Sequence, residues 1–285
     1  MQPYLCFCAG EILTHSLAPV RVPAKQQRTL MTSYAQNFED VMLRRALSDV
    51  ARGHYIDVGA QDPKADSVTK WFYDSGWSGI NIEPHPVYYV RLVGSRPRDV
   101  NLQIAVSDVE GISEFCFVDG SGLSSLDMNA ATVAAEHGLR STSGKVEVKT
   151  LNTVLERYPM PEIHFLKIDV EGAEAAVLAG IDLALHRPWI VLVEATEPCS
   201  PAPAWERFES SLTSRGYQCV YFDGLNTWYL RDESSELGEF FRHPPNVFDA
   251  FVRWKEREWD SMQTNESAKN RVLPVSGGFG GLFKR

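Results

Sequence analysis

The sequence has few basic residues and no run of them. Its 285 residues include 28 Lys and Arg against 37 Asp and Glu, which gives a formal net charge of -9. A protein that binds nucleic acid through the phosphates needs a basic patch or stripe. The composition therefore argues against a nucleic-acid partner.

Cysteine is also scarce, and the five cysteines are scattered. They are Cys6, Cys8, Cys116, Cys199 and Cys219. An odd number of cysteines without a pair of CxxC units supports neither a disulfide framework nor a structural zinc site. The simplest interpretation is a reducing compartment, and we expect a cytoplasmic location.

Long apolar runs are lacking as well. No stretch reaches the roughly 20 residues that a membrane-spanning helix requires. The most apolar segment near the N-terminus, residues 4–17, is interrupted by Gly10, Glu11 and His15. The sequence therefore predicts no stable membrane insertion.

What is present is enough apolar material for one sizeable core, since 44% of the residues are hydrophobic. Residues 1–30 show no sustained period and contain Pro3, Pro19 and Pro23, whereas the end of the chain is polar and then glycine-rich. We expect a poorly ordered N-terminal extension (1–30), one domain (31–255) and a disordered C-terminal tail (256–285).

The first helix is predicted from Tyr34 to Leu47. Ser33 and Gln36 have the spacing of a capping box, and apolar residues then recur at helical spacing.

Strand-like and helix-like segments alternate from residue 54 onward. The predicted strands of the main sheet cover residues 55–59, 79–83, 100–106, 164–169 and 189–195. Helix-like segments separate most of these strands, which is typical of a parallel sheet with right-handed crossovers. Segments 114–118 and 145–148, around the Gly/Ser-rich loop 120–125, are predicted as strands of an insertion outside that sheet.

The last two strand-like segments, residues 217–222 and 227–231, are separated by only four residues. This gap is too short for a helical crossover, so the two segments must pair antiparallel. The expected fold class is α/β: a mainly parallel sheet closed by an antiparallel C-terminal hairpin, with helices on both faces. This is the arrangement of the Rossmann-like methyltransferases.

The loop after the first predicted strand distinguishes between two kinds of cofactor. It keeps Gly59 but lacks the GxGxxG pattern that seats a pyrophosphate on a helix N-terminus. Asp57 and Asp62 would repel that pyrophosphate, whereas they would attract the ammonium and sulfonium groups of S-adenosylmethionine. The loop therefore favours S-adenosylmethionine over a nicotinamide dinucleotide.

Two residues at the following strand ends extend this cofactor site. Glu83 ends the second strand, where a carboxylate can accept hydrogen bonds from both ribose hydroxyls. Ser107 follows the third strand and is expected near the adenine edge. Each such residue taken alone is more often a cap or a solvated loop residue, but their order at consecutive strand ends favours a cofactor site.

Eight sequence blocks carry a further signal as a set. They are Gln36 with Glu39-Asp40, and residues 55–60, 81–84, 122–126, 165–174, 194–198, 221–226 and 244–249. Together these blocks resemble the FkbM family of methyltransferases, and the block FLKIDVEGAE at 165–174 is the most specific. The last three blocks resemble a branch of the family found with glycan-building enzymes.

The resemblance implies an S-adenosylmethionine-dependent methyltransferase (EC 2.1.1) that methylates a hydroxyl of a sugar, a glycan or a glycosylated natural product. It also implies that Gln36 approaches the amino-acid end of the cofactor or the acceptor. Ser124 is expected to contact adenosine or a sugar, because small hydroxyls and glycines suit such a loop. The glycan-linked branch suggests association with a glycosyltransferase, and a homo-oligomer is the other expected assembly.

Four residues are candidates for the chemistry of transfer. A neutral sugar hydroxyl is a weak nucleophile, so a base or a metal ion is needed to remove its proton. Asp169 at the end of the fourth predicted strand is the first candidate, with Glu171, Glu194 and His85. A second interpretation is that the first three hold Mg²⁺. Lys167 faces the site or extends toward solvent, so it receives no role.

A function of a different class stays open from the sequence. The chain can be a non-catalytic Rossmann-like partner module of a glycan-building enzyme. Asp57 and Asp169 argue against this interpretation, because a module without activity has no need to retain both carboxylates.

Overall fold

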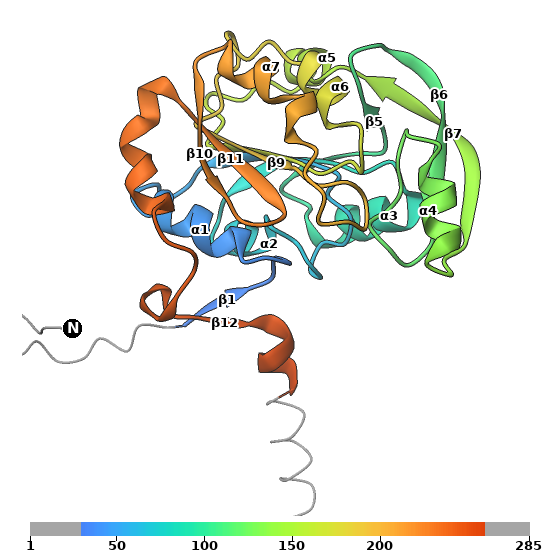
Figure 1. The fold of residues 1–285 in the computed structure, drawn as a ribbon. Coiled ribbons are helices and arrows are strands. Elements are labelled where there is room, and N and C mark those ends of the chain that lie inside the picture. The colour runs from blue at the N-terminus through green and yellow to red at the C-terminus, as the bar shows by residue number, and fades with distance from the viewer. Residues whose placement is uncertain (1–29, 260–285) are drawn as a thin grey trace, which may run out of the picture. The chain divides into compact units, whose positions relative to one another are not determined.

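A seven-stranded sheet is the centre of the computed structural model, which describes residues 30–259 (Figure 1). Almost all of the expected N-terminal extension and most of the expected tail lie outside the described residues. The strands follow the order β10 (Tyr217–Phe222), β11 (Asn226–Arg231), β9 (Ile190–Glu194), β8 (Phe165–Ile168), β2 (His54–Val58), β3 (Ser78–Ile82) and β4 (Val100–Leu102).

Five strands of this sheet, β9, β8, β2, β3 and β4, are mutually parallel. The expectation of a mixed α/β fold is therefore confirmed. Because parallel strands all end at the same edge of the sheet, the residues that follow β2, β3, β8 and β9 are brought together there.

Of the other two strands, β11 runs opposite to these five, whereas β10 runs in the same direction as they do. β11 pairs antiparallel with both β9 and β10, so the last strand of the sheet in chain order lies between two earlier ones.

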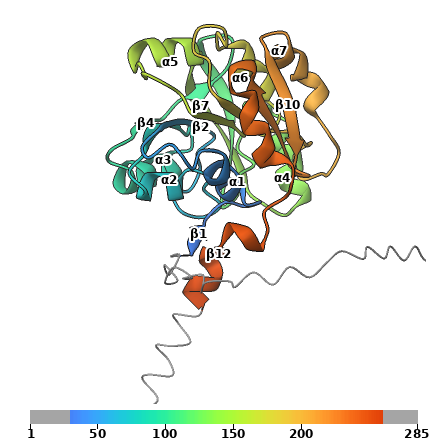
Figure 2. The ribbon, with the colours of Figure 1, turned by 90° about the vertical axis from the view of Figure 1, so that its left-hand side faces the viewer.

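Helices cover both faces of the sheet (Figure 2). On one face lie α1 (Glu39–Ala46), α2 (Lys70–Asp74) and α3 (Pro86–Ser95), and on the other lie α5 (Leu151–Arg157), α6 (Glu174–Ala179) and α7 (Glu209–Thr213). Short 3₁₀ helices η1 (Trp205–Arg207), η2 (Asp232–Phe241) and η3 (Val247–Asp249) complete this part of the chain.

The alternation of side chains along each strand produces two cores. Tyr55 and Phe165 pack with residues of α1 and α2, whereas Ile56 and Leu166 pack with residues of α5 and α6. Since alternate residues of a strand face the same side, Asp57 and Lys167 lie on the same face as Tyr55 and Phe165. The strand register pairs Asp57 with Lys167 directly.

A three-stranded sheet, β5 (Ala105–Val106), β7 (Ser141–Lys149) and β6 (Gly111–Val118), stands apart from the large one and carries α4 (Ala130–Glu136). The predicted strands 114–118 and 145–148 fall in β6 and β7. The prediction of one strand over 100–106 is wrong, because β4 pairs with β3 and β5 pairs with β7.

The start of the first helix also differs from the prediction. Ser33 belongs to β1 (Met31–Ser33), which pairs in parallel with β12 (Phe251–Arg253), and α1 begins only at Glu39. Phe38 precedes α1 with a φ of 64°, a left-handed conformation that a continuous helix excludes. The capping box is absent, because the Ser33 hydroxyl donates to Asp40 at 2.7 Å.

Between residues 30 and 259, the structure contains no helix with the length and apolar character needed to cross a membrane.

Candidate functional site

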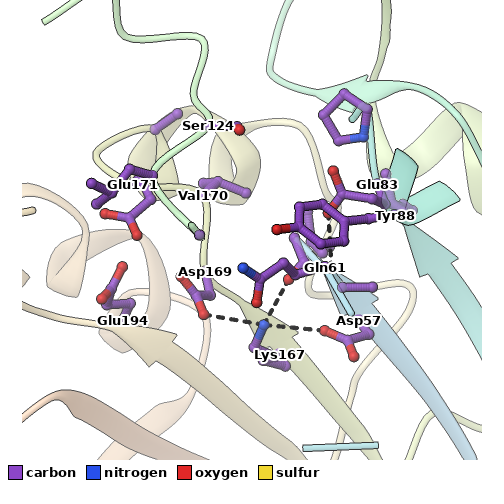
Figure 3. Close-up of a pocket in the computed structure, with 18 of the residues that line it drawn as sticks. Asp57, Gln61, Glu83, Tyr88, Ser124, Lys167, Asp169, Val170, Glu171 and Glu194 are labelled. Carbon is purple, nitrogen blue, oxygen red and sulfur yellow. Dashed lines mark hydrogen bonds and ion pairs between the residues drawn. The ribbon is translucent and has the colours of Figure 1, made fainter. Parts of the chain in front are cut away.

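A cavity of about 430 Å³ lies at the carboxyl edge of the large sheet (Figure 3). Its walls come from the ends of β2, β3, β8 and β9, from the loop 120–126 and from the segment 104–106. The parallel strands position these walls, since each of them delivers its following loop to the same edge.

Lys167 lies at the floor of the cavity, between two carboxylates. Its ammonium group is 3.3 Å from Asp57 Oδ1 and 3.2 Å from Asp169 Oδ2, and it donates to the Gly59 carbonyl oxygen at 2.8 Å. Although burial disfavours the charged form, Asp169 and Asp57 hold the pKa of Lys167 above its usual value. The group is therefore a permanent cation that ties β8 to the loop after β2.

The carboxylate of Asp57 is almost completely buried, with 1% of the residue exposed. Its Oδ2 accepts a hydrogen bond from the Thr69 hydroxyl at 2.9 Å. Among residues 30–259, Oδ1 accepts no hydrogen bond and has only the ionic contact with Lys167. A buried carboxylate oxygen that accepts no hydrogen bond fits a ligand that brings a donor. An ammonium group is such a donor.

Gly59 occupies a position that only glycine fits. Its φ is +78°, and a Cβ atom there would lie 1.8 Å from the carbonyl oxygen of Asp169. The amide groups of Gly59 and Ala60 donate to the Ile82 carbonyl at 3.0 and 3.1 Å. The loop after β2 is therefore held against both neighbouring strands.

Glu83, directly after β3, is the second buried carboxylate of the cavity. Its two oxygens accept hydrogen bonds from the amides of Gln61 at 2.8 Å and His85 at 2.7 Å. Burial raises the pKa of Glu83 to about 7, partly offset by these two bonds. Additional donors from a bound ligand would stabilise its charged form.

Apolar and aromatic side chains line the cavity on the same side as Glu83. They are Ile82, Pro84, Tyr88, Ile104, Ala105, Val106 and Phe115. Such a wall next to a carboxylate suits a flat heterocycle that is joined to a hydroxyl-bearing sugar.

A cluster of three carboxylates, here called the acidic cluster, lies on the other side of Lys167. It consists of Asp169, Glu171 and Glu194, and one oxygen from each lies within 4.8 Å of the others. Burial and the neighbouring charges of Asp169 and Glu174 raise the pKa of Glu171, and burial and the charges of Asp169 and Glu171 raise that of Glu194. The cluster has the donor set that Mg²⁺ prefers, and its raised pKa values also suit the uptake of a proton.

The turn that carries Glu171 is built from unusual backbone. Glu171 has a φ of 56° and Gly172 a φ of 101°. Glu174 caps the turn by accepting the amides of Val170 at 3.2 Å and Gly172 at 3.0 Å. This local role agrees with a structural function for Glu174.

Ser125, which is 1% exposed, anchors the same turn from the loop 120–126. Its hydroxyl lies 3.0 Å from the Val170 carbonyl and 2.9 Å from the Glu171 carbonyl. Sequence reasoning selected the neighbouring Ser124 instead, although both residues belong to the same block.

Most of the residues expected at the site are brought together. The cavity is lined by Gln36, Asp57, Gly59, Glu83, Ser124, Asp169, Glu171 and Glu194. Gln36 reaches it from the segment before α1 and not from a helix, and the Ser124 hydroxyl accepts the Val118 amide at 3.0 Å.

Asp62 and Ser107 do not line the cavity. Asp62 accepts the amides of Lys64 and Ala65, both at 2.9 Å, and pairs with Arg91 at 2.9 Å. Although burial opposes the change, these partners lower the pKa of Asp62. The Ser107 hydroxyl donates to Asp108 at 3.1 Å, outside the site.

His85 does not line the cavity either. It caps α3, since its Nδ1 accepts the Val87 amide at 3.3 Å, and its ring packs against Tyr88 and Phe117. Burial lowers the pKa of His85. The structure thus gives this histidine a structural place beside the site.

Other lining residues escaped the sequence reasoning, above all Lys167. The strand period was the available signal, because Lys167 and Asp57 each lie two residues after an aromatic residue of the core. Thr196, Cys199 and Ser200 also line the cavity, beyond the end of β9. Thr196 lies in the sequence block 194–198, which gave a signal for it, whereas Cys199 and Ser200 lie outside every such block.

A family model of the FkbM methyltransferase domain matches residues 57–219. This match covers more than half of the 285 residues and includes the ends of β2, β3, β8 and β9. No curated protein matches the chain.

Proposed function

The chain belongs to the FkbM methyltransferase family, and from this premise we propose that it transfers a methyl group from S-adenosylmethionine to a hydroxyl of a sugar, a glycan or a glycosylated natural product. The observation that carries the proposal is that the buried carboxylates of Asp57 and Glu83 line the same cavity as the acidic cluster. The first pair fits the donor, and the cluster fits the acceptor.

The donor is recognised by groups of opposite charge and matching hydrogen bonds. Asp57 Oδ1, which accepts no hydrogen bond from the described residues, would receive the ammonium group. Glu83 would accept the ribose hydroxyls, and the wall formed by Ile82, Tyr88 and Val106 would hold the adenine ring. When bound, S-adenosylmethionine supplies a methyl group on a sulfonium that leaves as a neutral thioether.

The acidic cluster has the task of preparing the acceptor. Lys167 fixes the carboxylate of Asp169, which suits a residue that holds the hydroxyl in place. One carboxylate of the pair Glu171 and Glu194, in its ionised form, then takes up the single hydroxyl proton as the acceptor oxygen bonds to the methyl carbon and the carbon–sulfur bond breaks. The three carboxylates equally fit Mg²⁺, which would bind the acceptor hydroxyl and promote loss of its proton.

The same proposal includes a carbohydrate acceptor, association with a glycosyltransferase or formation of a homo-oligomer, and a cytoplasmic location. The likeness of three sequence blocks to the glycan-linked branch of the family supports the acceptor and the glycosyltransferase partner. The scattered cysteines support the location.

Calorimetry with S-adenosylmethionine tests the donor site. Asp57→Asn and Glu83→Gln should each weaken binding by about tenfold or more, the loss of one charge-assisted hydrogen-bonding group. Asp74→Asn, at an exposed carboxylate on α2, is the matched control and should leave binding unchanged. A folded wild-type protein that does not bind the donor would contradict the proposal.

Transfer of a labelled methyl group onto free sugars and lipid-linked glycans tests the reaction, with and without EDTA. Loss of transfer in EDTA that Mg²⁺ restores would assign the acidic cluster to a metal ion, whereas transfer unaffected by EDTA would assign it to proton uptake. Donor binding without transfer to any acceptor of this class would favour the non-catalytic partner module.

A further inference from the structure

Lys167 is the only cationic side chain among the described residues that line the cavity. Six carboxylates share these walls, namely Asp57, Asp66, Glu83, Asp169, Glu171 and Glu194. The cavity is therefore strongly acidic around one buried cation, whose only part in the proposed function is to fix Asp169.

The position of the ammonium group is central. It bridges Asp57 and Asp169 at 3.3 and 3.2 Å, and only 11% of the side chain is exposed. Asp57 lies on the same side of Lys167 as Glu83, whereas Asp169 lies on the side of Glu171 and Glu194 (Figure 3). A ligand group that bridges the ends of β2 and β8 would lie beside this ammonium group and would be exposed to its electric field.

Charge changes at this place during methyl transfer. The donor enters with a positive sulfur, and the sulfur becomes neutral as the carbon–sulfur bond breaks. Negative potential at the sulfur therefore stabilises the bound donor more than the transition state, in which that positive charge is already decreasing. An interaction that is stronger in the ground state than in the transition state slows the reaction.

We propose that Lys167 is a counter-ion that limits the negative potential at the donor sulfur, so that the acidic cavity does not hold the cationic donor too tightly for transfer. This inference rests on the proposed function. Lys167 acts through the potential at the sulfur, and we assign it no covalent or proton-transfer step.

The relative affinity for donor and product measures this potential directly. S-adenosylmethionine and S-adenosylhomocysteine share the adenosine and the amino-acid end, and they differ in one methyl group and the charge on sulfur. The informative quantity is the Kd of S-adenosylhomocysteine divided by the Kd of S-adenosylmethionine, determined by calorimetry at low salt because salt screens charges.

Lys167→Met should raise this ratio by at least about 3-fold, the effect of one unit charge over several ångström even with the dielectric constant of water. Lys167→Arg keeps the charge and should leave the ratio close to the wild-type value. Lys149→Met is the matched control, because it removes a lysine from β7 that pairs with Glu110 and Glu147 away from the cavity.

A purely structural role would weaken both ligands by the same factor and leave the ratio unchanged, and that result would overturn the inference. If Lys167→Met does not fold, the ratio is instead compared between Asp169→Asn and the double variant Asp169→Asn/Lys167→Met. The double variant leaves one fewer carboxylate without its counter-ion, so it should fold more readily. Failure of the wild type to bind either ligand would instead contradict the proposed function.

Discussion

The carbonyl oxygen of Asp169 occupies the place that a side chain on residue 59 would take. A Cβ atom on Gly59 would lie 1.8 Å from this oxygen. The ends of β2 and β8 can therefore approach each other only because residue 59 is glycine, and this approach brings Asp57, Lys167 and Asp169 into contact.

Gly59→Ala should accordingly destabilise the protein by about 2 kcal/mol or more, from steric overlap and from the positive φ. Chemical unfolding would measure this loss, and calorimetry should show weaker donor binding. Gly94→Ala is the control, because nothing lies within 4 Å of its Cβ position in α3 and φ there is not positive. That change should stabilise the helix by roughly 0.5–1 kcal/mol; equal behaviour of the two variants would contradict the close approach.

Donor binding should depend on pH through Glu83. The pKa of this carboxyl in the free protein is raised to about 7 by burial, and its charged form is the better acceptor for ribose hydroxyls. Affinity should fall as pH decreases below 7, by up to roughly tenfold per pH unit. Glu83→Gln should remove this dependence, whereas Glu114→Gln at an exposed position of β6 should retain it.

Stability should depend on pH through Glu39, at the start of α1. Burial raises the pKa of Glu39 to about 7, so the folded state favours the protonated carboxyl. The stabilisation is complete below the ordinary pKa near 4.5 and is lost as pH rises through about 7. Its size is on the order of 3 kcal/mol.

Unfolding in urea at pH 5, 6, 7 and 8 would measure this effect. Glu39→Gln should flatten the decline in unfolding free energy with rising pH, because the amide does not titrate. Glu114→Gln should preserve the decline. An unchanged slope in Glu39→Gln would mean that Glu39 is already ionised at pH 5.

Ser125→Ala should destabilise the turn that carries Glu171. The change removes the hydroxyl that contacts the carbonyls of Val170 and Glu171 and accepts the amide of Asp127 at 2.9 Å. The loss should be about 1–3 kcal/mol in urea unfolding, since buried partners are left unpaired. Ser113→Ala, on the exposed part of β6, should be close to neutral.

The apolar segments of the sequence predicted four of the five parallel strands, β2, β3, β8 and β9, because nearly every residue of these strands is buried. The same pattern could not show which strands pair with each other. Residues 100–106 were predicted as one strand, but β4 completes the large sheet and β5 joins β7, a division that only the tertiary structure reveals. The pairing of Met31–Ser33 with Phe251–Arg253 likewise links segments more than 200 residues apart.

The residues of the site could be predicted where their position at the end of a parallel strand places them in the cavity. Asp57, Glu83, Asp169 and Glu194 follow or end parallel strands, and the sheet itself gathers them. Asp62 and His85 lie further along the loops that follow β2 and β3, where local hydrogen bonds determine the direction of each side chain. Those bonds depend on Arg91 and on the cap of α3, which no spacing rule encodes.

The insertion of β11 between β9 and β10 also has a consequence for synthesis of the protein. While the ribosome extends the nascent chain, β9 has a partner on one side only until residue 231 has left the exit tunnel. An exposed strand edge of this kind invites pairing with other chains. Premature termination between residues 195 and 225 should therefore yield aggregates rather than a smaller working enzyme.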